Sequence, residues 1–148
     1  MIETGAESGI AFRYDLIERT PNTLASHVMI ADARRAGGLP LQDAAVEALF
    51  SAYFVEGRDV GRPEVLRDIA AQVGFDHGPS VSAELWELVQ QEDVDARQSG
   101  ITGVPTFLLD GHTLFNGAQP AETIVRMLRA ASGSTVDAAY AVRSEERL

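Results

Sequence analysis

One stretch of the chain, residues 104–117, interrupts an otherwise helical pattern. Its sequence, VPTFLLDGHTLFNG, predicts two short strands around Asp110-Gly111, because Asp-Gly between apolar runs is the strongest short-range signal for a β-hairpin. A hairpin alone is marginally stable in water, so its apolar residues need cover from other strands or helices. The stretch therefore predicts that the chain builds at least part of a sheet.

The rest of the chain is typical of helices that end at glycine. Apolar residues recur at helical spacing in four segments before the hairpin and in one after it. Glycine is a common residue just beyond the last turn of a helix. We expect helices over residues 20–36, 41–56, 63–73, 79–99 (with a break near Ser82) and 120–132.

The two ends of the chain differ from this pattern. Residues 2–9 resemble the last turns of a helix that ends at Gly9, and residues 10–17, IAFRYDLI, alternate apolar and polar residues as an extended segment does. Residues 133–148 are polar and of mixed charge, which is typical of a poorly docked helix or a disordered tail. The predicted fold class is α/β, mainly helical by content, in four parts: 1–19, 20–99, 100–132 and 133–148.

Composition excludes several classes of function. The net charge of −10 repels a phosphate backbone, so we expect no nucleic-acid partner. No apolar run reaches the roughly 20 residues that a membrane span needs, so we expect no membrane partner. The count of cysteines is zero, which excludes disulfides, thiolate metal ligands and a cysteine nucleophile within these residues.

No catalytic residue follows from residue types alone. His27, His77 and His112 have no second ligand at metal-binding spacing, so structural or surface roles are the preferred interpretation, and we expect no metal and no cofactor. The acidic residues Glu92, Asp93 and Asp95 fit a solvated helix face.

The proline that opens the hairpin carries the most specific motif. Proline lacks the N–H that a strand ladder needs, so Pro105 at the start of an apolar strand is unusual. Three stretches of the chain occur in the order seen in the DsbA family. In chain order they are TPNT with His27, LFSAYFVEGRDVGRPEVLRDIAAQVG, and GITGVPTFLLDGHTLFNGAQPAETIVRML. The chain resembles this family over about residues 2–131. Within it, the chain is most similar to the FrnE-like dithiol-disulfide isomerases, which are close to the 2-hydroxychromene-2-carboxylate isomerases and kappa-class glutathione transferases.

The resemblance implies a fold and a binding site. The fold is a partial thioredoxin-like one, with a helical insert followed by a hairpin and a helix. By resemblance, Pro105 is a cis residue beside the thiol pair of the family, and Val104 offers its backbone to an extended ligand. Thr106 flanks this pair and Gln119 lies at the end of the far strand. The expected substrate-binding residues are thus Val104, Pro105, Thr106 and Gln119.

One departure from the family bears on activity. In the family, a strand, a helix bearing Cys-x-x-Cys or Ser, and a second strand precede the helical insert, and nothing in this chain corresponds to them. We therefore expect that the chain lacks the redox half of the domain. Thiol–disulfide exchange requires a thiolate, so the chain is expected to be inactive by itself, and whether it is an enzyme stays open.

Three functions are compatible with these observations. The first is a FrnE-like thiol-disulfide oxidoreductase or isomerase. The alternatives are a thiol-free module that binds a peptide or protein partner, and a glutathione-dependent isomerase of the 2-hydroxychromene-2-carboxylate type. The expected partners are an extended peptide or a thiol, glutathione included, and the expected compartment is the cytoplasm, as in FrnE-like proteins. We also expect self-association through the edge of strand Thr106–Leu109, unless residues 10–17 cover it.

Overall fold

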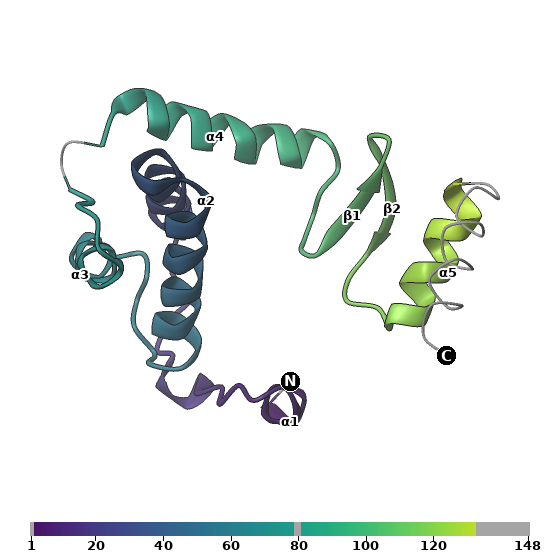
Figure 1. Cartoon of the computed structure of the whole chain (residues 1–148), viewed down its shortest axis with the longest axis horizontal. Coiled ribbons are helices and arrows are strands. Elements are labelled where there is room, and N and C mark those ends of the chain that lie inside the picture. The colour runs from purple at the N-terminus through teal and green to yellow at the C-terminus, as the bar shows by residue number, and fades with distance from the viewer. Residues whose placement is uncertain (1, 79–80, 133–148) are drawn as a thin grey trace, which may run out of the picture. The chain divides into compact units, whose positions relative to one another are not determined.

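The computed structural model describes residues 2–78 and 81–132 of the chain (Figure 1). It divides into two compact units, Met1–Asp95 and a second unit that begins at Ala96, and each is described by itself. The tail predicted at 133–148 lies outside the described residues. Among the helices of the described residues, none is long and apolar enough to cross a lipid bilayer.

The elements confirm a mainly helical α/β chain. Two strands lie between the fourth and fifth helices, as the change of hydrophobic period predicts. In order the described elements are α1 Ile2–Glu7, a 3₁₀ turn Tyr14–Leu16, α2 Leu24–Phe54, α3 Pro63–Val73, α4 Ala83–Gln98, β1 Thr106–Leu109, β2 His112–Asn116 and α5 Ala121–Ser132.

Helix α2 contains the break that the glycine pair predicts. Gly37 and Gly38 have non-helical backbone angles, and Gly38 has a φ of 71°. Helical hydrogen bonding resumes with Pro40 inside α2, where its missing N–H costs little because it follows the break directly. The two predicted helices, 20–36 and 41–56, are therefore two arms of α2.

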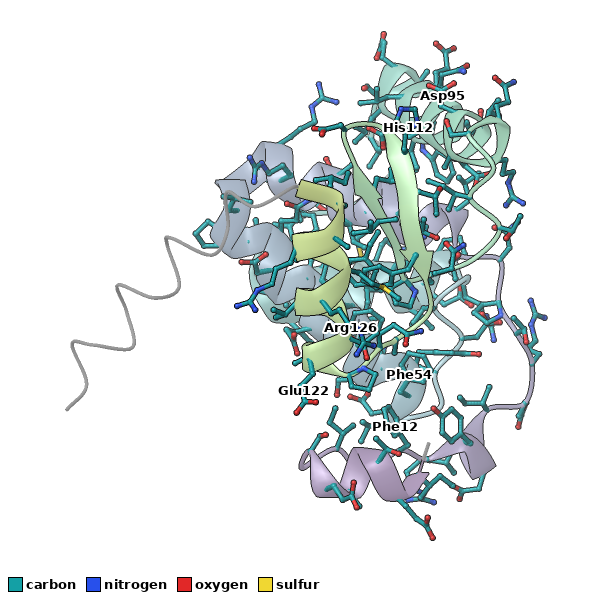
Figure 2. The ribbon with its side chains drawn as sticks, turned by 90° about the vertical axis from the view of Figure 1, so that its right-hand side faces the viewer. Phe12, Phe54, Asp95, His112, Glu122 and Arg126 are labelled. Carbon is teal, nitrogen blue, oxygen red and sulfur yellow. The ribbon has the colours of Figure 1, made fainter. Side chains whose placement is uncertain are left out.

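Residues 10–17 depart from the predicted extended segment. Tyr14–Leu16 form a 3₁₀ turn, and the N–H of Arg13 donates to the carbonyl of Phe54 at 2.8 Å. Phe12 lies against Phe54 with ring centroids 5.8 Å apart (Figure 2). The segment is thus attached to the end of α2, and it is not a strand of the described sheet, which has two strands.

The core of the first unit lies between α2 and α3. Met29 of α2 and Leu66 and Ile69 of α3 are at most 2% exposed. Burying a side chain of this size contributes about 1.5–3 kcal/mol. Helix α3 begins at Pro63, a favoured first position, and ends at Gly74, whose φ is 91°. Both of its ends agree with the prediction.

Helix α4 packs against α2 through a second cluster, in which Val28, Leu85 and Val89 are buried. The helix begins at Ala83, later than the predicted residue 79, because the N–H of Leu85 donates to the hydroxyl of Ser82 at 3.3 Å. A serine at this position satisfies a backbone donor that the first helical turn leaves without a partner. The break expected near Ser82 is thus the start of α4.

The second unit holds the predicted hairpin. Strands β1 and β2 pair antiparallel, from Thr106 with Asn116 to Leu109 with His112, with one register shift after Phe107. Asp110 has a φ of 50° and Gly111 a φ of 79°, the positive values that a two-residue type I′ turn requires. Helix α5 follows, and the carbonyl of Pro120 accepts its first backbone hydrogen bonds, so Pro120 immediately precedes the helix.

Candidate functional site

The segment between α4 and β1 contains three of the four predicted binding residues. Helix α4 ends with the N–H of Ile101 donating to the carbonyl of Ala96 at 3.1 Å, and Gly100 has a φ of 78°. The segment then runs without regular structure to Thr106, and the peptide bond between Val104 and Pro105 is cis.

Two contacts tie this segment to the hairpin. The N–H of Gly117 donates to the carbonyl of Pro105 at 2.8 Å. The hydroxyl oxygen of Thr106 lies 2.6 Å from the carbonyl of Gly103 and 2.8 Å from Oδ1 of Asn116. Short polar contacts from both strands therefore hold the turn around Pro105 in one conformation. Thr106 has a positioning role in this geometry.

Val104 projects from this fixed turn. The residue is 91% exposed. Among the described residues, neither its N–H nor its carbonyl takes part in a hydrogen bond. The carbonyl of Pro105, by contrast, is already paired with Gly117. Val104 therefore presents one donor and one acceptor of the main chain, which is what an extended polypeptide needs to pair as an added strand.

Gln119, the fourth predicted residue, is exposed and lies two residues beyond Gly117. The structure places Gly117 next to Pro105. No hydrogen bond joins the side chain of Gln119 to another described residue. Its predicted role in substrate binding stays a prediction.

The hairpin gives this site an aromatic surface. The rings of Phe107 and Phe115 stack with centroids 4.3 Å apart, and Phe115 is 9% exposed. Phe107 is 38% exposed and Leu108 is 50% exposed. Stacking of this kind adds about 0.5–1.5 kcal/mol of stabilisation to that from burial of the rings. It therefore stabilises the hairpin, whose first strand carries Thr106.

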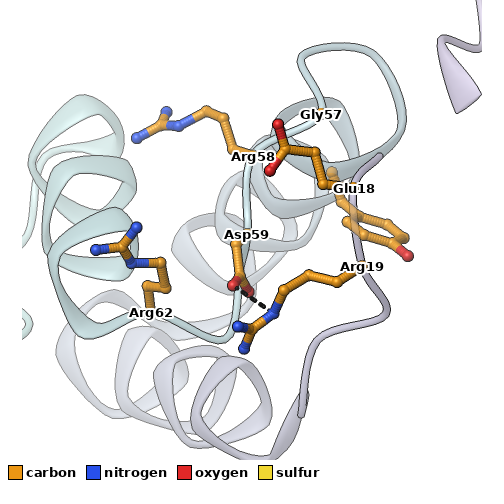
Figure 3. A pocket seen from close by; sticks show the side chains of 7 residues that line it. Glu18, Arg19, Gly57, Arg58, Asp59 and Arg62 are labelled. Carbon is orange, nitrogen blue, oxygen red and sulfur yellow. Dashed lines mark ion pairs between the residues drawn. The ribbon is translucent and has the colours of Figure 1, made fainter. Parts of the chain in front are cut away.

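A polar hollow in the first unit is a second candidate (Figure 3). It measures about 440 Å³, and Nε of Arg19 bonds to the carboxylate of Asp59 at 3.1 Å on one side of it. Its lining residues are Glu18, Arg19, Tyr53, Gly57, Arg58, Asp59 and Arg62. Sequence analysis does not reveal this hollow, because the two segments that line it are about 40 residues apart.

Carboxylates already neutralise the arginines of this hollow. Arg58 lies 2.6 Å from Asp68, and Arg62 pairs with Glu64. The pKa of Glu64 is lowered, chiefly by a hydrogen bond from its own backbone N–H, and Arg62 lowers it further. The cluster therefore has no surplus of positive charge for an anionic ligand, and we interpret it as a set of ion pairs that connects the segment before α2, the loop between α2 and α3, and α3.

The three histidines belong to different parts of the chain. His27 lies on α2, His77 follows α3 and His112 begins β2. Within residues 2–78 and 81–132, no three His, Asp or Glu side chains gather as metal ligands would. The open backbone at Val104 therefore remains the strongest candidate site.

Comparison with known proteins places the chain in a family. A model of the DSBA-like thioredoxin domain matches residues 1–129, nearly the whole described chain. No match is found among curated proteins. Helices followed by a two-stranded antiparallel sheet and a further helix are consistent with a partial thioredoxin-like fold. The chain thus belongs to the DSBA-like thioredoxin domain family.

Proposed function

We propose that this chain serves thiol–disulfide exchange as the ligand-holding part of a FrnE-like oxidoreductase or isomerase. The observation that carries the proposal is the exposed Val104, whose backbone N–H and carbonyl have no partner among the described residues. Membership of the DSBA-like thioredoxin domain family supports the thiol chemistry. The same resemblance to FrnE-like proteins supports the cytoplasm as the compartment.

An extended peptide suits this backbone for a physical reason. Its main chain donates to the carbonyl of Val104 and accepts from the N–H of Val104, whatever side chains it carries. Pro105 has no N–H, and its carbonyl already accepts from the N–H of Gly117. Of these two residues, only Val104 can therefore pair with the main chain of a peptide. Such a site binds many sequences, which suits an enzyme that acts on disulfides in different proteins.

The chemical step needs a group that these residues do not contain. In exchange, a thiolate attacks one sulfur of a disulfide, the S–S bond breaks, and the other sulfur leaves as a thiolate. Because the 148 residues contain no cysteine, the attacking thiolate comes from outside them. We therefore propose that these residues bind the substrate and a cysteine-bearing segment or partner performs the exchange.

The proposal is tested by removing the N–H of Val104. Val104→Pro removes the donor, whereas Val104→Ala keeps it and changes only an exposed side chain. We expect the Kd of an extended disulfide-containing peptide to rise about fivefold in Val104→Pro, since one hydrogen bond is worth roughly 1 kcal/mol. We expect Val104→Ala to bind as the wild type does. Calorimetry measures the affinity, and circular dichroism confirms that both variants are folded.

A change in the ligand provides an independent check. N-methylation of the peptide residue that faces Val104 blocks the same pairing without altering the protein. Equal binding of the methylated and unmethylated peptides by the wild type, or of one peptide by both Val104 variants, would contradict the proposal.

A thiol-free module that binds peptides is the second candidate, and the absence of cysteine favours it. Thiol titration of the native protein, purified without alkylating agents and freed of added reductant, separates the two. Thiols that copurify in stoichiometric amount support the oxidoreductase, and peptide binding by a native protein without thiols supports the module. The third alternative is a glutathione-dependent isomerase. It predicts that this chain binds glutathione more tightly than it binds an extended peptide.

A further inference from the structure

The second strand of the hairpin ends in an asparagine that is followed by a glycine. Asn116 is the last residue of β2, and Gly117 follows it with a φ of 78°. In such a pair the backbone nitrogen of the glycine can attack the side-chain amide, because glycine has no Cβ to hinder the approach. The pair is therefore a candidate site of covalent modification that needs no other reacting side chain.

The reaction open to this pair is deamidation. The nitrogen of Gly117 loses its proton and attacks Cγ of Asn116, and the new C–N bond closes a succinimide ring. The C–N bond of the side-chain amide breaks, and its nitrogen takes up a proton and leaves as ammonia. Water then opens the ring at either of its carbonyl carbons, which leaves aspartate or isoaspartate at position 116. Water is the only co-reactant.

The structure engages both reacting groups of this pair. The N–H of Gly117 donates to the carbonyl of Pro105 at 2.8 Å. A nitrogen that donates to a carbonyl keeps its proton, so this bond must break before the nitrogen can attack. Oδ1 of Asn116 lies 2.8 Å from the hydroxyl oxygen of Thr106. This contact restrains the rotation that would bring Cγ to the nitrogen of Gly117.

The same two contacts hold the turn around Pro105. One of them fixes the carbonyl of Pro105 and the other fixes Thr106, the next residue. Pro105 and Asn116 are both exposed. Hydrogen bonds at an exposed edge open more often than those of a core. A single event, the opening of this turn, therefore releases both reacting groups.

The only other asparagine of the chain provides an internal comparison. Asn22 is exposed, as Asn116 is, and its Oδ1 accepts from the N–H of Leu24 at 3.0 Å. The residue after Asn22 is Thr23, whose β-branched side chain crowds its own backbone nitrogen. The two asparagines thus share exposure and a side-chain contact, and the following glycine distinguishes Asn116.

We propose that Asn116-Gly117 is a self-modification site at which Asn116 deamidates from the open state of the turn around Pro105. In the isoaspartate product, a methylene group of the side chain becomes part of the main chain. The path from Phe115 to Gly117 is then longer, so the N–H of Gly117 no longer lies opposite the carbonyl of Pro105. The reaction involves this chain and water alone, and it does not depend on the thiol chemistry proposed above.

The aspartate product also alters the turn. The hydroxyl of Thr106 carries a single hydrogen, and its oxygen lies 2.6 Å from the carbonyl of Gly103, which only accepts. After a half-turn the amide of Asn116 can donate its NH₂ to this hydroxyl, whereas a carboxylate cannot. With a carboxylate at position 116, Thr106 therefore donates to one of its two neighbours and loses the other. Deamidation thus favours the open turn and is not reversed.

The reaction is followed on the full chain by mass spectrometry. The native protein and the same protein unfolded in guanidinium chloride are incubated in parallel, and peptide mapping locates each conversion of amide to acid. An isoaspartyl methyltransferase labels the isoaspartate product independently. We expect Asn116 to react while Asn22 stays intact, and the native protein to react at least about fivefold more slowly than the unfolded one, because the turn must open first.

Matched variants test the control by the turn. Thr106→Val removes the hydroxyl that contacts Asn116 and keeps the shape of the side chain, and Thr113→Val makes the same change at an exposed position of β2. We expect Thr106→Val to accelerate deamidation of the native protein about fivefold and Thr113→Val to leave it within about twofold. Both variants should react like the wild type in denaturant, which separates the effect of the turn from the chemistry.

Hydrogen exchange at the N–H of Gly117 measures the opening of the turn directly. We expect this N–H to be protected in the wild type and to lose protection in the deamidated protein, which ion exchange separates by its added negative charge. This measurement stays informative even where Thr106→Val does not fold.

Several outcomes would overturn the proposal. Equal rates in the native and unfolded protein, or equal rates at Asn116 and Asn22, would each do so. The same holds for equal effects of Thr106→Val and Thr113→Val on the native protein, the absence of any conversion in both included. An unprotected N–H of Gly117 in the wild type would show that the turn does not hold the reaction back.

Discussion

Ser26 is the only buried polar residue in the part of the chain that the structure describes. Its side chain forms a hydrogen bond with the backbone of a distant loop. Its hydroxyl donates to the carbonyl of Val60 at 2.7 Å, across 34 residues of sequence. Val60 is 4% exposed, so no water replaces this donor easily. The bond fixes the loop that leads from α2 into α3.

We expect Ser26→Ala to lower the free energy of unfolding by about 1–3 kcal/mol, because the Val60 carbonyl would stay buried without a donor. Urea denaturation followed by circular dichroism measures the change. Ser51→Ala is the matched control, since Ser51 is exposed on the same helix, and it should shift stability by less than about 0.5 kcal/mol. Equal losses in the two variants would show that the Val60 contact is not the cause.

At the scale of elements, two glycines that both have a positive φ have different roles. Gly57 follows α2 with a φ of 69°, and Gly74 follows α3 with a φ of 91°. A Cβ on Gly57 would lie 2.4 Å from the Cβ of Leu16 and 2.7 Å from its carbonyl oxygen, whereas one on Gly74 would meet nothing within 4 Å. Gly57 therefore permits the close approach of the 3₁₀ turn to α2.

We expect Gly74→Ala to cost about 1–2 kcal/mol, the ordinary penalty of a left-handed residue with a side chain. Gly57→Ala should cost more, because the backbone of Leu16 must also shift. Hydrogen exchange distinguishes the two effects: residues 10–17 should lose protection in Gly57→Ala and keep it in Gly74→Ala. Equal exchange of residues 10–17 in both variants would show that this approach does not hold the segment.

At the scale of the whole molecule, no third strand pairs with β1 or β2 among the described residues. Among the described residues the sheet has two strands, and Phe107 and Leu108 of β1 are 38% and 50% exposed. Unpaired apolar edges promote association. We propose that copies of the chain associate through the edge of Thr106–Leu109, and that the net charge of −10 opposes this by mutual repulsion.

Sedimentation analysis tests the association. We expect more dimer as salt rises from about 0.05 to 0.5 M, because screening removes the repulsion between copies. Leu108→Lys should abolish this increase, since a charged residue at an edge opposes pairing. Leu39→Lys alters net charge equally at an exposed leucine of α2 and should still associate. A monomer at all concentrations and salt levels would exclude the proposed edge.

Local features of the sequence were sufficient for most of the fold. Asp110-Gly111 predicted the hairpin because its turn depends on two residues, and Gly37-Gly38 predicted the break in α2 because backbone angles there are local. The 3₁₀ turn at Tyr14–Leu16 was not predicted, since it depends on Phe54 and Gly57, about 40 residues away. The pairing of Asp32 with His77 was missed for the same reason.

The sequence by itself determined the helices and the hairpin, through periodicity and glycine positions, and the absence of a thiol, through composition. By resemblance it also predicted that Val104 and Pro105 bind the substrate. Only the tertiary structure decided that the backbone of Val104 is open while that of Pro105 is paired, and that segments about 40 residues apart line a polar hollow. Turns and helices follow from interactions between near neighbours, whereas an open donor or a lined hollow depends on which distant residues the fold brings together.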